Sequence, residues 1–180
     1  MKTRKLGNAQ VSEIGLGTMS FGGIFGPTDQ AESLACLDAM LDAGITFIDT
    51  ANIYGMGVSE DVIGQWLSLR KPQVTIATKA SVVNETPRRI DNSESHLRAE
   101  LEISLRRLNR DHVELFYIHR RDHTRPIEEV VGTLKRFIEE GKIGGYGMSE
   151  VAPDTLRRAH SVHPCTAVQN EYSLWTRQPE

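Results

Sequence analysis

Apolar residues follow two alternating patterns along the chain. Short continuous apolar runs, typical of buried strands, are separated by longer segments in which apolar residues recur every three or four positions, as on one face of a helix. The runs cover residues 14–18, 45–50, 74–79, 113–119, 143–149 and 167–170. Continuous runs of this kind suit parallel strands that are covered on both faces. The repeated strand–helix unit with short connections predicts a parallel sheet with right-handed crossovers.

The helical segments are bounded by residues that favour helix ends. Their predicted starts, in chain order, are Thr28, Ser59, Ser93, Pro126 and Pro153. Gly44 and Gly141 are predicted to end the first and fourth helices, because glycine readily adopts the left-handed conformation that follows many helices. The fourth helix carries the cleanest apolar stripe in the chain. A hairpin over residues 3–13 is predicted ahead of the first strand.

Every second residue of a strand faces the same side of the sheet. In four of the predicted strands, the last residue on one side is polar. These residues are Asp49, Lys79, His119 and Ser149. In a barrel, inward side chains pack in layers up to the C-terminal rim, where they open into a site. The pattern therefore predicts an α/β fold of the (β/α)8 TIM-barrel type. The barrel is incomplete here, with about six of the eight βα units and an N-terminal β-hairpin.

A doubly wound dinucleotide-binding fold is the main alternative. Its fingerprint has three glycines that open a helix after the first strand. In this chain Gly15 and Gly17 are followed by Thr18, Met19 and Ser20, so the third glycine is missing. We reject this alternative.

Composition fits one globular domain over residues 1–180. The chain has 39% hydrophobic and 25% charged residues and a net charge of -3, which gives no reason to expect nucleic acid or an anionic membrane as partner. No apolar run approaches the ~18 residues of a membrane span, and we predict a cytoplasmic protein. Cys36 and Cys165 are predicted to be reduced and interior. Neither cysteines nor histidines show ligand spacing, so no metal site is predicted.

Four ionisable side chains fall at or just after predicted strand ends. They are Asp49, Tyr54, Lys79 and His119. A lysine on the inward parity of an apolar strand is costly unless it is paired. Because a barrel gathers these positions at one mouth, they predict a catalytic site.

The motifs around these residues resemble those of the aldo-keto reductases. In chain order they are Gly15-Leu16-Gly17-Thr18-Met19, Phe47-Ile48-Asp49-Thr50-Ala51, Tyr54-Gly55, Ile76-Ala77-Thr78-Lys79, Tyr117-Ile118-His119-Arg120, Gly147-Met148-Ser149-Glu150 and Gln169-Asn170-Glu171-Tyr172. The resemblance runs from about Lys5 to the C-terminus. It implies an NADPH-dependent oxidoreductase that reduces small aldehydes or ketones to alcohols.

The family's catalytic tetrad carries over onto Asp49, Tyr54, Lys79 and His119. Carbonyl reduction needs a hydride on carbon and a proton on oxygen. Tyr54 is the implied general acid, and a cation beside its phenol would stabilise the phenolate. Lys79 can supply that charge, and Asp49 can hold the ammonium in place. His119 can orient the carbonyl, while the hydride must come from a cofactor.

The resemblance also implies the cofactor contacts. Gly17, Thr18 and Met19 follow the first strand, Asp49 lies near the ribose, and Ser149 and Gln169 face the nicotinamide carboxamide. In the family, the last two barrel strands supply the groups that hold the adenosine 2′-phosphate. The chain is expected to be truncated after the sixth strand and to lack that 2′-phosphate site.

Six strands leave two sheet edges open, which predicts self-association or completion by another segment. The alternative to a working reductase is a truncated, non-catalytic remnant that acts as a binding or regulatory module or requires complementation. The intact tetrad favours the reductase.

Overall fold

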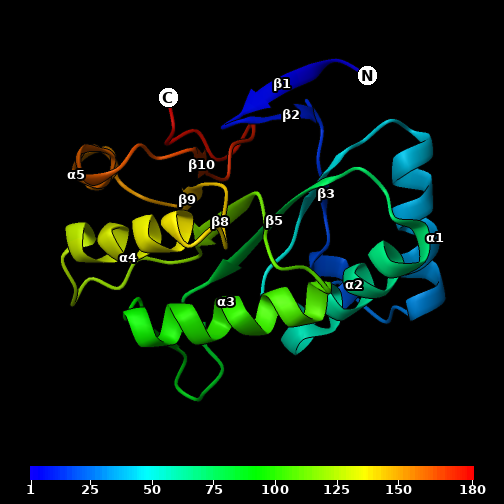
Figure 1. Ribbon diagram of the computed structural model, residues 1–180, viewed down its shortest axis with the longest axis horizontal. Helices are drawn as coiled ribbons and strands as arrows, with labels where there is room; N and C mark the ends of the chain where they lie inside the picture. The colour runs from blue at the N-terminus through cyan, green and yellow to red at the C-terminus, as the bar shows by residue number, and fades with distance from the viewer.

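The computed structural model describes all residues from 1 to 180 and shows a parallel half-barrel of six strands (Figure 1). The strands are β1 Thr3–Leu6, β2 Ala9–Ser12, β3 Leu16–Gly17, β4 Phe47–Asp49, β5 Thr75–Ala80, β6 Val82–Val83, β7 Arg89–Ile90, β8 Leu115–Ile118, β9 Tyr146–Ser149 and β10 Ala167–Gln169. The helices are α1 Gln30–Asp42, α2 Val58–Arg70, α3 Glu94–Leu108, α4 Ile127–Glu139 and α5 Pro153–Val162. The main sheet has the order β10-β9-β8-β5-β4-β3.

The N-terminal hairpin is confirmed and covers one end of this sheet. Strands β1 and β2 pair antiparallel, and the Ser12 amide donates to Thr46 Oγ1, directly before β4. The hairpin therefore lies at the amino ends of the strands, opposite their carboxyl ends. No helix in the structure is both long and apolar enough to cross a bilayer.

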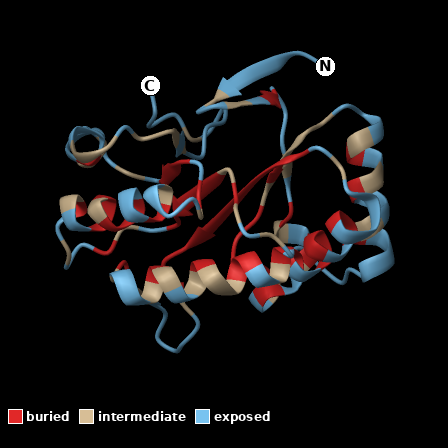
Figure 2. Ribbon diagram, in the orientation of Figure 1, coloured by how far each residue is buried: buried red, intermediate tan, exposed pale blue.

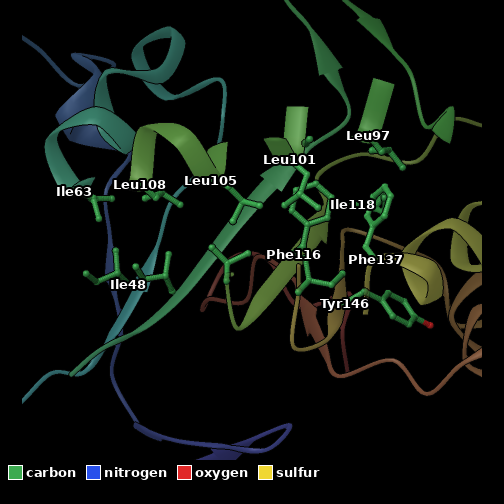
Figure 3. Close-up of a cluster of buried hydrophobic side chains, with 14 of the residues drawn as sticks. Ile48, Ile63, Leu97, Leu101, Leu105, Leu108, Phe116, Ile118, Phe137 and Tyr146 are labelled. Atoms are coloured by element: carbon green, nitrogen blue, oxygen red, sulfur yellow. The ribbon is translucent and has the colours of Figure 1, made fainter. Parts of the chain in front are cut away.

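Two apolar clusters divide the sheet by face. The larger one contains 27 buried residues and fills the space between the outer face of the sheet and the helices (Figures 2 and 3). The smaller one, on the inner face, consists of Ala77, Leu115 and Tyr117, with Leu6, Phe47 and Ala167 packed against it. The residues of the inner cluster occupy the alternate strand positions that the sequence analysis assigns to the barrel interior. The predicted alternation is thus confirmed.

Several predicted helix starts are shifted. Asp29, rather than Thr28, caps α1 by accepting from the Glu32 amide, and Pro126 is the N-cap of α4 rather than its first residue. Ser93 caps α3 as predicted. Ser59 does not cap α2, because the helix begins one residue earlier, after Gly57. A left-handed glycine is an alternative way of entering a helix, and it leaves the serine free for other bonds.

The cysteines are free, but the predicted interior position is wrong for Cys36, which is exposed. It lies in α1, whose buried residues are Ser33, Leu37 and Met40. Cys165 is partly buried next to β10.

The sheet ends at β3 and β10, each of which pairs with one neighbour only. This agrees with the two edges expected from the six-strand pattern. Association of copies through these edges stays a prediction.

Close packing of α2 on α3 depends on Gly64. A Cβ at this position would overlap with the carbonyl oxygen and carbon of Arg107 in α3. We expect Gly64→Ala to lower the free energy of unfolding by about 1–3 kcal/mol, because the two helices must move apart. The matched change Gly132→Ala meets only the far end of Arg136 and should instead raise it by about 0.5–1 kcal/mol. Urea denaturation of both variants measures the contrast, and equal effects would refute the packing argument.

Candidate active site

The carboxyl ends of the central strands bring the four tetrad side chains together. Asp49 ends β4, Lys79 lies near the end of β5 and His119 follows β8. Tyr54 enters from a 3₁₀ turn, Tyr54–Gly57, between β4 and α2. Lys79 is fully buried, and Tyr54 and His119 are both 8% exposed. Residues distant in sequence therefore share one partly enclosed site.

The Lys79 ammonium lies at the centre of these contacts. Its Nζ donates to Asp49 Oδ2 at 2.6 Å, to the Thr50 carbonyl at 2.8 Å and to the Tyr54 hydroxyl at 3.4 Å. Burial lowers the pKa of Lys79, and the charge and hydrogen bond of Asp49 oppose that shift. The carboxylate thus keeps a cation in a place where an unpaired one would be unfavourable.

Burial raises the pKa of Tyr54 to about 12, with a further increase from the Asp49 charge and a decrease from Arg120. The phenol therefore holds its proton at neutral pH. Sequence reasoning emphasises the phenolate-stabilising effect of Lys79, but desolvation decides the direction in this structure. Lys79 still contacts the phenol directly, so its charge lies where negative charge would develop on proton donation.

His119 packs edge-on against Tyr54, with ring centroids 6.0 Å apart and an interplanar angle of 84°. Its backbone amide donates to Ser81 Oγ and to the Ala80 carbonyl, whereas its Nδ1 is buried without a partner. Burial lowers the pKa of His119 to about 3, with further decreases from Lys79, Arg120 and Arg88. The imidazole is neutral near pH 7 and has one N–H to donate.

This lowered pKa of His119 has a consequence for stability. Below about pH 6.5 the unfolded chain protonates this histidine, while the native chain resists protonation until about pH 3. The stability it contributes is therefore complete above pH 6.5 and is lost as the pH falls towards 3. Between pH 7 and pH 4.5 we expect a loss of about 3 kcal/mol.

Urea titrations at several pH values measure this loss. The variant His119→Gln should flatten the acid limb of the stability profile, and His123→Gln, at an exposed histidine, should leave it unchanged. An unchanged acid limb in His119→Gln would refute the assignment.

A buried hydroxyl cluster lies behind the tetrad. Ser59 Oγ donates to Thr18 and is 3.0 Å from Thr50 Oγ1, and the Thr18 hydroxyl donates to the Asp49 carbonyl. The Thr50 carbonyl in turn accepts from Lys79. The cluster connects the end of β3 to the tetrad, and it explains why Ser59 is not a helix cap.

The turn that carries Tyr54 is held from outside by α2 and α3. Met56 adopts φ 57°, and its carbonyl accepts from Arg107 Nη2 at 3.3 Å. Arg107 also pairs with Glu60, whose buried carboxylate accepts from Thr78 next to Lys79. Burial raises the pKa of Glu60. The sequence does not predict the pairing of Glu60 with Arg107, because this contact forms only when α2 packs against α3.

The residues proposed to hold a cofactor lie along the same end of the sheet. Gly17 pairs with Asp49 in register, and Ser149 pairs with Gln169. Gly17, Asp49 and Gln169 also line a cavity of about 410 Å³, but most of its other lining residues belong to the N-terminal hairpin at the opposite end of the strands. A Cβ at Gly17 would meet nothing within 4 Å, which leaves room for close approach of a ligand.

Asp49 Oδ1 is buried and lacks a donor, so it offers an acceptor to a ligand hydroxyl. This free acceptor and the open space at Gly17 fit a ribose-containing cofactor. The Thr18 side chain and amide are already engaged with Asp49 and Ser59, which leaves this residue to shape the turn. No group of three or more His, Cys, Asp or Glu side chains is arranged to hold a metal ion.

A second cavity, of about 240 Å³, lies beside the tetrad. Its lining includes Tyr54, His119 and Met19. Most of the remaining lining is apolar, and the cavity is open to solvent beside the β6–β7 pair. Sequence analysis missed this pair, because each strand has only two residues. Through this cavity a small molecule can reach the tyrosine and the histidine.

Comparisons with known proteins agree with this geometry. The model of the Aldo/keto reductase family matches residues 13–180. The chain is 41% identical over 175 residues to "Probable aldo-keto reductase 1" of Glycine max, covering 95% of the chain and 51% of that protein. It is 37% identical over 184 residues to "Aldo-keto reductase yakc (NADP(+))" of Schizosaccharomyces pombe, covering 99% and 54%. The chain spans about half the length of the curated relatives it matches.

Solved structures give the same result. The glycerol dehydrogenase AKR11B4 from Gluconobacter oxydans matches with a TM-score of 0.88 and 31% identity, over 97% of this chain and 56% of that one. The holo form of the aldo-keto reductase AKR11C1 from Bacillus halodurans matches with a TM-score of 0.88 and 30% identity, over 99% and 60%. The half-barrel is therefore similar to part of these (β/α)8 barrels.

Proposed function

The chain belongs to the aldo/keto reductase family, and from this premise we propose that it reduces small aldehydes or ketones to alcohols with NADPH as the hydride donor. The observation that supports this most is the Lys79 ammonium, which lies between Asp49 and the Tyr54 hydroxyl at the carboxyl end of the sheet. The chemistry needs a proton donor, a charge beside it and a donor for the carbonyl oxygen, and Tyr54, Lys79 and His119 have these properties.

In this proposal Tyr54 gives its hydroxyl proton to the carbonyl oxygen. A phenol with a pKa of about 12 keeps its proton until negative charge develops on the oxygen of the substrate. Lys79 stabilises the phenolate that remains, because its Nζ is 3.4 Å from the phenol oxygen. Asp49 keeps the ammonium charged in its buried position. The neutral imidazole of His119 orients the carbonyl by donating a hydrogen bond.

NADPH, when bound, supplies the hydride for the carbonyl carbon. We propose that Gly17, Met19 and Asp49 hold it at one edge of the sheet and that Ser149 and Gln169 hold the carboxamide end. Gly17 allows close approach of the backbone, and Asp49 Oδ1 is the free acceptor. Thr18 contributes by holding the turn after β3, since its polar groups already bond to Asp49 and Ser59.

Titration of the purified chain with NADPH, followed by cofactor fluorescence with NADH in parallel, tests the cofactor part. Saturable binding of NADPH, followed by its oxidation on addition of a small aldehyde, is the expected result. A folded chain that binds neither cofactor would contradict the proposal and favour the non-catalytic alternative.

A further inference from the structure

We propose that the carbonyl substrates of this site carry an anionic group, such as a carboxylate, which Arg88 and Arg120 bind while the carbonyl faces Tyr54 and His119. The inference rests on the proposed function and names its substrate class. It comes from the charges that line the cavity beside the tetrad.

The lining of that cavity, of about 240 Å³, contains two arginines and no acidic residue. Apolar side chains form most of its wall; they include Met19, Ile24, Ile53, Val82 and Val83. Arg88, which is an exposed residue, and Arg120 also line the cavity, and the lining contains no carboxylate. After burial and Lys79, the charges of Arg120 and Arg88 also lower the pKa of His119. A mainly apolar cavity whose lining includes two arginines and no acid favours an apolar substrate with a negative group.

Neither arginine has an acidic partner within the protein. Arg88 donates no hydrogen bond and lies in no ion pair. Arg120 donates through Nη1 to two neutral acceptors, the His119 carbonyl at 2.7 Å and Ser149 Oγ at 3.1 Å. Its remaining N–H groups are free. Because a guanidinium presents several donors in one plane, it suits a carboxylate or a phosphate better than a neutral group does.

Acidic side chains are present in the loop that carries Arg88, but they pair with the next residue, Arg89. Arg89, in β7, pairs with Glu85 at 2.6 Å and with Asp91 at 3.0 Å. Arg88 lies one residue before β7 and lines the cavity, whereas Arg89, Glu85 and Asp91 are not part of that lining. The difference between the two arginines is one of position, which makes them a matched pair for an experiment.

The test compares two aldehydes of similar shape and different charge, para-carboxybenzaldehyde and para-carbamoylbenzaldehyde. In the native chain kcat/KM for the carboxylate should exceed that for the amide by about tenfold or more, the effect of one charge-assisted contact. Arg88→Gln should reduce this ratio several-fold, with Arg120 still in place, and Arg89→Gln should retain it. A ratio near one in the native chain, or an unchanged ratio in Arg88→Gln, would overturn the inference.

Two further outcomes separate this inference from the proposed function. If Arg88→Gln weakens NADPH binding and leaves the substrate ratio unchanged, the arginine serves the cofactor and the inference is wrong. If neither aldehyde is reduced, the proposed function fails, and calorimetric titration with para-carboxybenzaldehyde decides the inference. Binding that weakens several-fold in Arg88→Gln supports it, and absent or equal binding overturns it.

Discussion

Replacement of Tyr54 by Phe is expected to lower kcat for carbonyl reduction by about 10²–10⁴-fold, the usual contribution of a positioned general acid. The change removes one oxygen, so the ring and its edge-on contact with His119 remain. Lys79 keeps its bonds to Asp49 and the Thr50 carbonyl. Cofactor binding should therefore be unchanged, and the loss should appear in kcat.

The matched control is Tyr146→Phe. The Tyr146 hydroxyl donates to the His163 carbonyl on the outer face of the sheet, away from the tetrad. Its removal should cost about 1 kcal/mol of stability and leave kcat near the native value. Steady-state kinetics and NADPH titration of both variants measure the contrast. Native kcat in Tyr54→Phe would refute the assignment of the proton donor, and equal loss of kcat and NADPH binding would point to a structural role.

Replacement of Lys79 by Met is expected to abolish turnover and to lower stability together. Methionine fills a similar volume but cannot pair with Asp49, whose side chain is only 17% exposed. Breaking a buried ion pair by removing one partner costs about 3–5 kcal/mol, and partial hydration of Asp49 places the expected loss near 2–4 kcal/mol. Urea denaturation gives the stability, and NADPH oxidation with an aldehyde gives the turnover.

A double variant separates the two effects of Lys79. Adding Asp49→Asn to Lys79→Met removes the unpaired charge and should recover most of the lost stability without restoring turnover. A Lys79→Met chain with native stability would show that the ion pair is not buried as the structure has it. Native turnover in that variant would show that the tyrosine needs no cationic partner.

Three of the four tetrad residues can be predicted from the sequence alone, because each is the last polar residue on the inward-facing side of a predicted strand. Asp49, Lys79 and His119 end inward series on neighbouring strands, and parallel strands bring their carboxyl ends together. Tyr54 comes five residues after Asp49, just past a strand end, and its role as proton donor is implied by the family resemblance. Its direction is set by a turn in which Met56 has a positive φ, a conformation with no clear local signal in the sequence.

Other features could not be predicted because they depend on distant neighbours. A serine ahead of an apolar stripe fits a helix cap, and only the approach of Thr18 shows that Ser59 belongs to the hydroxyl cluster. The pair of Glu60 and Arg107 exists because α2 packs on α3. Arg120 donates to Ser149 Oγ across the strand ends, a contact that depends on the pairing of β8 with β9.

Transfer of label from NADPH deuterated at its transferable position to benzaldehyde would show directly whether this chain reduces a carbonyl group. The purified chain should yield benzyl alcohol with one deuterium on the carbinol carbon, detected by mass spectrometry, and Tyr54→Phe should yield almost none. This result would show that the half-barrel performs hydride transfer with the tyrosine as proton donor. A folded native chain that gives no deuterated alcohol would contradict the account.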